Sequence, residues 1–148
     1  MSEQRLEPRN ELEEQLAALR DGVLAPERFF QGVLGQQVFM PVKEEGPDIQ
    51  GFQASQKATP LSLESEEGVK VLILFTAPER AVEFLRQFEG YKGGILENLG
   101  WVLRRMGAGY GVAINPGWDL GIDLDEETVA ALAAQAAAMG EEGEGASS

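Results

Sequence analysis

The sequence contains neither histidine nor cysteine. Without histidine, the chain lacks the side chain that ordinarily titrates near neutral pH and that most often binds metals. Without cysteine, it can form no disulfide bond, thiolate metal site or cysteine nucleophile. An enzyme made from this chain would have to use carboxylates, lysine, tyrosine or a borrowed cofactor. We therefore expect a protein without enzymatic activity and without a cofactor.

Positive charge is also scarce. The chain has 12 Lys and Arg residues against 25 Asp and Glu residues, which gives a formal net charge of -13. Such a field repels phosphate backbones and anionic membrane surfaces. We therefore expect no nucleic-acid partner and no membrane partner. Solubility alone explains the excess of acids most simply, and attraction of a basic protein partner is the alternative.

Long apolar runs are missing as well. The longest wholly apolar run, residues 71–75, is far shorter than the roughly 20 residues that span a bilayer. The N-terminal segment MSEQRLEPRNELEEQ is charged throughout and has no apolar signal-peptide core. Together with the absent cysteines, this pattern favours a cytoplasmic location.

What remains is typical of one globular domain, with 148 residues and 43% hydrophobic side chains. We expect the domain to span residues 1–139, with its N-terminal helices over residues 8–34. Residues 140–148, GEEGEGASS, have too few apolar groups to offset the entropy of ordering. They are expected to form a flexible, acidic, glycine-rich tail.

Helical spacing of apolar residues predicts the N-terminal helices. The first, over residues 8–21, has its apolar stripe at Leu12, Leu16, Leu19 and Val23. The second begins at Ala25 and Pro26, because proline is well tolerated in a first helical turn, and it ends at Gly35.

Strands are predicted in the middle of the chain. Residues 37–42, QVFMPV, form a first strand in which Pro41 marks an edge position or the strand's end. Residues 52–55 and 61–63 are expected to form a hairpin. Residues 69–75 are apolar on both faces after Lys70, which predicts a strand in the centre of its sheet.

The second half of the chain alternates helices and strands. Thr76 and Glu79 have capping-box spacing for a helix that runs to Phe88 and buries Ala81, Val82, Leu85 and Phe88. Residues 95–106 predict a helix, or a helix that breaks into a strand. Residues 110–114 predict a strand, and residues 126–139 a helix capped by Asp125 with a hydrophobic staple from Leu124 to Val129, burying Val129, Leu132, Ala136 and Met139. This order favours an α+β fold, a single domain with a mixed or antiparallel sheet flanked by helices.

A sharp corner follows the strand at residues 110–114 and is the candidate recognition site. It consists of Asn115, Pro116, Gly117, Trp118 and Asp119. Proline fixes φ and glycine can supply a positive φ, so the chain leaves the sheet abruptly. Trp118 either folds back onto the core or stands out as an interface anchor.

The acids after this corner have two interpretations. Asp119, Asp123 and Asp125 crowd towards a helix N-terminus, where carboxylates are favoured. With Glu126 they could instead hold Ca²⁺ or Mg²⁺, but their spacing matches no EF-hand loop, so they are weak metal candidates and we expect no metal site. Thr76 could bind an anion at its own junction, although a capping role is favoured there.

Several of these segments occur together in a known family. The junctions LFTAPERA (residues 74–81) and AINPGWDLGIDLDEETVAAL (residues 113–132), preceded by QVFMPV, resemble the N-terminal domain of the SseB family. That family is associated by name with enhanced serine sensitivity. The resemblance covers most of residues 10–135 and implies a compact α+β domain, without implying catalytic residues. Longer members carry a second domain, for which the glycine-rich tail leaves no room.

Three functions are consistent with these features. The favoured one is a non-enzymatic protein-binding or regulatory module that holds a protein partner or forms a homodimer, through an exposed apolar patch rimmed by acids. The second is an effector chaperone of the type III secretion kind, a class that is small, acidic and dimeric. The third is a carboxylate or metal-dependent enzyme that uses Asp119, Asp123 and Asp125.

Overall fold

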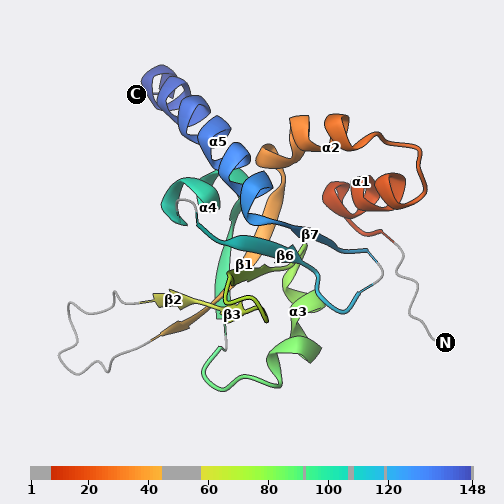
Figure 1. Cartoon of the computed structure of the whole chain (residues 1–148), viewed down its shortest axis with the longest axis vertical. Helices are drawn as coiled ribbons and strands as arrows, with labels where there is room; N and C mark the ends of the chain where they lie inside the picture. The colour runs from red at the N-terminus through yellow and green to blue at the C-terminus, as the bar shows by residue number, and fades with distance from the viewer. Residues whose placement is uncertain (1–7, 45–57, 92, 107–108, 119, 148) are drawn as a thin grey trace.

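A computed structural model of the chain describes residues 8–44, 58–91, 93–106, 109–118 and 120–147 (Figure 1). For residues 44, 58 and 140–147 the description covers the backbone alone. The helices are α1 (Glu11–Arg20), α2 (Pro26–Gly32), the 3-10 helix η1 (Val33–Gly35), α3 (Pro78–Leu85), α4 (Leu99–Met106) and α5 (Glu126–Ser147). The strands are β1 (Gln37–Glu44), β2 (Ala58–Pro60), β3 (Ser62–Glu64), β4 (Lys70–Leu74), β5 (Gly93–Asn98), β6 (Gly111–Ile114) and β7 (Ile122–Leu124).

The strands form two sheets. One has the order β2-β1-β5 and is antiparallel throughout. The other has the order β3-β4-β6-β7, in which β4 and β6 are parallel and the outer pairs are antiparallel. Helices pack around both sheets, so the α+β class with a mixed or antiparallel sheet is confirmed. No helix within the described ranges is long and apolar enough to cross a bilayer.

The two sheets are joined along β1. Phe39 and Phe75 exchange backbone hydrogen bonds of 2.7 and 2.9 Å. Leu61, between β2 and β3, donates its N–H to the carbonyl of Pro41 and accepts from the N–H of Ile73. Strand β1 is therefore a central strand, and the prediction that Pro41 marks an edge or an end is wrong. Its nitrogen faces the junction where the Leu61 carbonyl already bonds Ile73, so the missing N–H breaks no ladder.

Strand β4 is buried on both faces, as predicted. Leu72 and Leu74 belong to the larger core, which the sheets share with α1, α2, α4 and α5. Ile73 and Phe75 belong to a smaller core on the opposite face. Helix α3 covers this second face (Figure 1), and its Ala81 is buried there. Strand β4, which was predicted to be central, therefore lies between the two cores and contributes side chains to both.

The N-terminal helices lie close to the predicted positions. Leu12 and Leu16 of α1 are buried, but Val23 is 80% exposed, so its assignment to the apolar stripe is wrong. Helix α1 ends at Arg20, and Gly22 then turns the chain with a φ of 79°. Pro26 begins α2 as predicted.

The start of α3 differs from the prediction. Its N-cap is Ala77, which makes no side-chain cap hydrogen bond, and the hydroxyl of Thr76 bonds Glu13 instead. The predicted capping box is therefore wrong. Val82 is 53% exposed rather than buried. Phe84 replaces it in the core, with its ring 5.7 Å from that of Phe75.

Strand β5 replaces the first part of a predicted helix. Residues 95–98 pair with β1, and only the following residues form α4, where Leu99, Val102 and Leu103 are buried. Gly94 lies beneath the ring of Phe39, and a Cβ at this position would be 2.6 Å from that ring. The glycine therefore permits a close approach that fixes β5 beside β1.

The C-terminal segment follows the prediction at its start and departs from it at its end. Strand β7 was not predicted, and α5 continues to Ser147 instead of ending at residue 139. Met139 is 52% exposed, which contradicts its predicted burial, whereas Val129, Leu132 and Ala136 are buried. The flexibility expected of residues 140–148 stays a prediction. The predicted strand at residues 52–55 lies outside the described residues.

Candidate functional site

The predicted corner is the turn between β6 and β7. Asn115 has a left-handed φ of 57°, and Gly117 has a φ of 89°. The N–H of Trp118 donates to the carbonyl of Asn115 at 3.0 Å, which closes the turn. Left-handed backbone is tolerated by asparagine better than by most side chains. The sharp exit from the sheet is therefore confirmed, but it leads into a paired strand before α5 begins.

Asn115 is 1% exposed, and its amide joins the corner to the end of β4. Its Oδ1 accepts from the N–H of Thr76 at 2.9 Å. Its Nδ2 donates to the Thr76 hydroxyl at 2.9 Å and to the Leu120 carbonyl at 2.8 Å. This side chain is committed to internal hydrogen bonds and lies out of reach of a partner.

The same Thr76 hydroxyl reaches a buried carboxylate. Glu13 of α1 is 0% exposed, and its Oε2 accepts from Thr76 Oγ1 at 2.5 Å. Arg80 of α3 donates from Nε to Oε2 and from Nη2 to Oε1, both at 2.8 Å. The N–H of Arg9 adds a bond to Oε1 at 2.9 Å. A fork-shaped pair of this kind is among the strongest hydrogen-bonded contacts in proteins.

These four buried side chains, Glu13, Thr76, Arg80 and Asn115, form what we call the polar lock. Burial alone would raise the pKa of Glu13, but hydrogen bonds from Arg80, Thr76 and the Arg9 backbone outweigh it and lower the pKa to about 2. The hydrogen bond to Glu13 correspondingly raises the pKa of Arg80. The lock therefore holds a permanent ion pair at physiological pH.

Trp118 lies against the outer side of this lock. Its indole Nε1 donates to the carbonyl of Arg80 at 2.8 Å, and its ring lies 5.5 Å from the guanidinium carbon of the same residue. The side chain is half-buried. Packing against α3 thus occupies the polar edge and one face of the ring.

The remaining corner residues differ in exposure. Pro116 is half-buried and Gly117 is exposed, whereas Asp119 lies outside the described residues. The surface open to a partner here consists of Pro116, Gly117 and the outer part of Trp118. The recognition role of the corner stays a prediction.

The acids predicted as weak metal candidates do not come together in the described part of the chain. Asp123 is exposed on β7, and Asp125 caps α5 by accepting from the N–H of Thr128 at 2.8 Å, as predicted. Bonds from Thr128 lower the pKa of Asp125. Within the part of the chain that the structure describes, no three His, Cys, Asp or Glu side chains are placed to hold a metal ion.

Sequence reasoning missed the centre of the polar lock. Asn10 and Glu13 have the spacing of a helix cap, and Asn10 does accept from the N–H of Glu13 at 2.9 Å. That signal could have marked the start of α1. It could not have revealed Arg80, which lies 67 residues away in the chain.

Comparison with protein families gives a match over most of the chain. The SseB protein N-terminal domain matches residues 12–131, which include α1 except for its first residue, both strand-to-helix junctions and the corner. No curated protein and no solved structure matches the chain. Because the match covers most of the chain and the structure has the α+β class expected for it, we conclude that this protein belongs to the SseB family.

Proposed function

We propose that this SseB-family domain is a non-enzymatic binding module that pairs with a second copy of itself along the open edge of β5. The observation that supports the proposal is that β5 is the last strand of its sheet and, among the described residues, pairs with β1 on one side only. The other edge strands, β2, β3 and β7, have three residues each, whereas β5 has six. An open edge of this length is a template for another strand.

The backbone direction of β5 follows from its neighbour. Phe39 and Pro41 of β1 direct their backbone groups towards Phe75 and Leu61, on the side away from β5. Backbone direction alternates along a strand, so the residues of β1 between them bond β5 at Ile95 and its alternate neighbours. The N–H and C=O groups of Gly94 and Leu96 and the N–H of Asn98 consequently face outwards from the sheet, whereas the carbonyl of Asn98 belongs to the first turn of α4.

The side chains of this edge favour an apolar contact. Leu96 is 46% exposed although it lies in the middle of a strand. Proteins commonly protect open edges with lysine, proline or a bulge, and none of the three outward-facing residues is a lysine or proline. An unprotected edge with an exposed leucine supports a role in association.

The sequence of β5 is also compatible with self-pairing. An antiparallel pair centred on Leu96 would place Leu96 opposite its copy and Gly94 opposite Asn98. Glu97 would lie opposite Ile95 and not opposite the other Glu97. Apolar cross-strand pairs stabilise sheets, and like charges directly opposite destabilise them. This register places no like charges directly opposite each other. We therefore propose that a second copy of the chain pairs with this edge.

The polar lock supports a non-enzymatic role. The carboxylate of Glu13 accepts bonds from Arg80, Thr76 and Arg9, and the Asn115 amide bonds Thr76 and Leu120. Catalytic acids and bases need pKa values near the working pH and access to a substrate. Glu13 has a pKa of about 2 and is fully buried, which suits it to holding α1 in place.

Light scattering over a range of protein and salt concentrations tests the proposal. We expect a dimer that tightens as salt rises, because two chains with a net charge of -13 each repel one another and salt screens the repulsion. Leu96→Lys should give a monomer with unchanged folding. Val23→Lys adds the same charge at a more exposed residue and should leave the dimer intact.

Two results would reject this proposal. One is a wild-type chain that stays monomeric at every concentration and salt. The other is a dimer that Leu96→Lys and Val23→Lys weaken equally, because net charge and not the β5 edge would then control association.

A further inference from the structure

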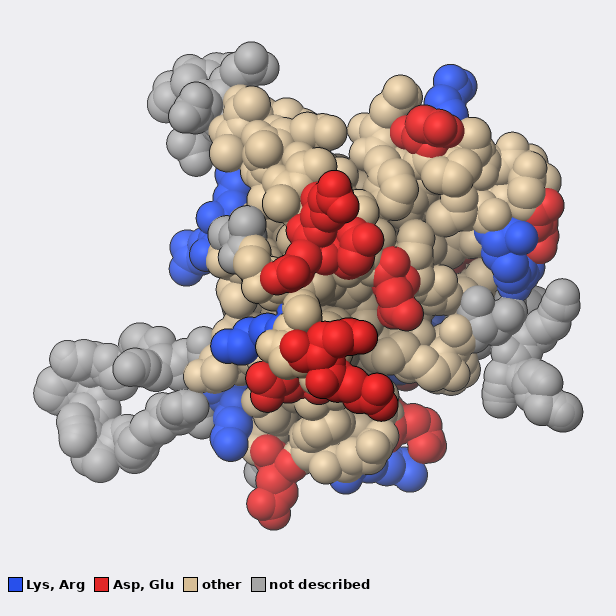
Figure 2. Space-filling model, in the orientation of Figure 1, with Lys and Arg blue, Asp and Glu red and all other residues tan. Residues whose placement is uncertain are grey.

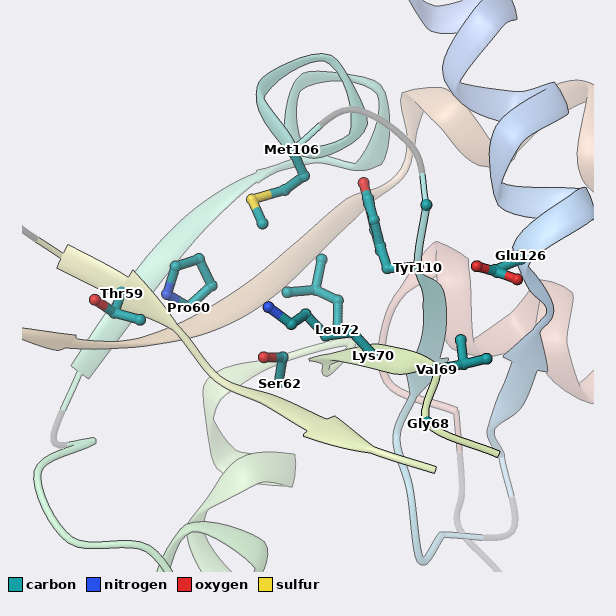
Figure 3. Close-up of a pocket in the computed structure, with 11 residues that line it drawn as sticks. Thr59, Pro60, Ser62, Gly68, Val69, Lys70, Leu72, Met106, Tyr110 and Glu126 are labelled. Carbon is teal, nitrogen blue, oxygen red and sulfur yellow. The ribbon is translucent and has the colours of Figure 1, made fainter. Parts of the chain in front are cut away.

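A pocket of about 510 Å³ opens between β2, β3, β4 and the residues Met106, Gly109 and Tyr110 (Figure 3). This volume is within the range of about 300 to 1,000 Å³ that is typical of small-molecule sites. The pocket takes no residue from the polar lock and none from β5. It is therefore a feature separate from the edge proposed for association.

The pocket has an apolar lining from separate parts of the chain. Leu72 of β4 is 1% exposed and lies below the pocket, between Pro60 of β2 and the ring of Tyr110 (Figure 3). Met106, at the end of α4, is 36% exposed and reaches over the pocket from the opposite side (Figure 3). An apolar body would be covered from two sides here, and its burial would drive binding.

Tyr110 supplies a polar group without a partner. It is 5% exposed, and within the described ranges its hydroxyl has no hydrogen-bond partner. Its ring lines the pocket beside Leu72, with the hydroxyl level with Met106 (Figure 3). A buried hydroxyl left unpaired is costly, and such groups in native proteins are commonly satisfied by water or a ligand. Burial raises the pKa of Tyr110 to about 12, so the hydroxyl is a proton donor at physiological pH.

The charged groups of the pocket lie at different places. The Lys70 side chain extends across the pocket towards Pro60 and Ser62, and the carboxylate of Glu126 lines the pocket on the other side of Tyr110 (Figure 3). The ammonium group and the Ser62 hydroxyl can both donate hydrogen bonds. Exposed acids gather around this region, over the start of α5 and the β3–β4 hairpin (Figure 2), and they include Glu64, Glu66, Glu67, Asp125, Glu126 and Glu127. Lys70 is the one basic side chain among the described residues that line the pocket, so an anionic group would have to bind next to it.

We propose that this pocket binds a small amphipathic carboxylate. The carboxylate group bonds Lys70 and Ser62, and the apolar body lies between Leu72 and Met106. The Tyr110 hydroxyl, which lies level with Met106 (Figure 3), donates to a water held beside the ligand. Lys70, Ser62 and Tyr110 can all donate hydrogen bonds, whereas Glu126 lines the pocket on the other side of Tyr110, so the Lys70 end of the pocket selects an acceptor over a cation. The inference does not depend on self-association through β5.

Nuclear magnetic resonance titration with three matched probes tests this selectivity. Hexanoate, hexanol and hexylamine share one apolar chain and carry a negative, a neutral and a positive head group. We expect hexanoate to shift the backbone amides of Val69, Lys70 and Tyr110 most strongly and hexylamine least. Tighter binding of hexylamine than of hexanoate would reject the proposal, and so would the absence of shifts with all three probes.

Variants locate the two ends of the ligand. Lys70→Met keeps the length of the side chain and removes its charge, so it should weaken hexanoate about fivefold and leave hexanol unchanged. Met106→Glu places a negative charge at the pocket and should abolish hexanoate binding. Met139→Glu adds the same charge at an exposed position of α5 and should have no effect. Equal hexanoate binding by wild type, Lys70→Met and Met106→Glu would overturn the assignment.

Tyr110→Phe separates binding from folding. Because the variant removes a hydroxyl that has no described partner, the free protein should melt at the same or a higher temperature than wild type. Hexanoate should nevertheless bind severalfold more weakly. Undiminished hexanoate affinity in Tyr110→Phe would contradict the role given to the hydroxyl, whatever happens to the melting temperature.

Discussion

Trp118 holds Arg80 in two ways at once, through a 2.8 Å hydrogen bond from its indole to the Arg80 carbonyl and through a ring that lies 5.5 Å from the guanidinium carbon. The guanidinium in turn holds both oxygens of Glu13. The corner after β6, helix α3 and helix α1 are thereby linked through a single side chain. A substitution in the corner, α3 or α1 should therefore disturb the packing of the other two elements.

The contributions of Glu13 and Arg80 to the free energy of unfolding should be strongly coupled. Glu13→Gln leaves the buried Arg80 charge without a counter-charge and should lower the free energy of unfolding by about 3 to 5 kcal/mol. Arg80→Met should cost a similar amount. The double variant Glu13→Gln/Arg80→Met should then lose far less free energy of unfolding than the sum of the losses in the two single variants. Urea denaturation of the four proteins measures the coupling, and strictly additive losses would mean that the two side chains act independently.

Low pH should destabilise the domain because it protonates Glu13. Its pKa falls from 4.5 in the unfolded chain to about 2 in the folded protein. The carboxylate therefore contributes its full stabilisation, about 3 kcal/mol, above pH 4.5 and loses it as pH falls towards 2. The free energy of unfolding between pH 6 and pH 2 measures the slope. Glu13→Gln should be less stable at pH 6 and should show a shallower slope, and an unchanged slope would assign acid sensitivity to other carboxylates.

Two substitutions of Trp118 should distinguish its hydrogen bond from its packing. Trp118→Phe keeps an aromatic ring near Arg80 but loses the indole N–H, which should cost about 1 kcal/mol. Trp118→Ala also removes the half-buried ring and should cost about 2 to 3 kcal/mol. Thermal or chemical unfolding measures both values. If Trp118→Ala is as stable as wild type and instead loses a binding partner, the tryptophan is a recognition anchor and not a packing element.

Gly94 should tolerate no side chain. A Cβ there would lie 2.4 Å from the carbonyl of Met40 and 2.6 Å from the ring of Phe39. Gly94→Ala should therefore displace β5 from β1 and lower the free energy of unfolding by about 1 to 3 kcal/mol. Gly35→Ala is the matched control, since a Cβ at Gly35 meets no atom within 4 Å. Equal stability of both variants would contradict the close contact between β1 and β5.

Local patterns predicted those parts of the fold that depend on local physics. The apolar residues of β4 require burial on both faces, and both cores supply it. Asp125 caps α5 because a carboxylate next to a helix start can accept from the nearby N–H groups. Pro26 begins α2 for a similarly local reason. Each of these features is determined within a few residues of sequence.

Features that depend on distant partners were missed or assigned wrongly. Ile95 and Leu96 keep helical spacing with Leu99, and only pairing with β1 makes them a strand. Thr76 has the right spacing for a cap, but the carboxylate of Glu13 competes for its hydroxyl and prevails. The corner was predicted as a turn, whereas its attachment to Arg80 could not be predicted, because Arg80 lies 38 residues earlier in the chain than Trp118.

The hydrogen bonds around Glu13 also decide how much of the chain forms an independent folding unit. The family match covers residues 12–131, yet Asn10 caps α1 and also donates to the carbonyl of Thr76 at 3.1 Å. At the other end, Leu132 and Ala136 are buried after the match has stopped. A fragment cut at the family limits would lose a helix cap at one end and two core side chains at the other. The cooperative unit is therefore longer than the stretch by which the family is recognised.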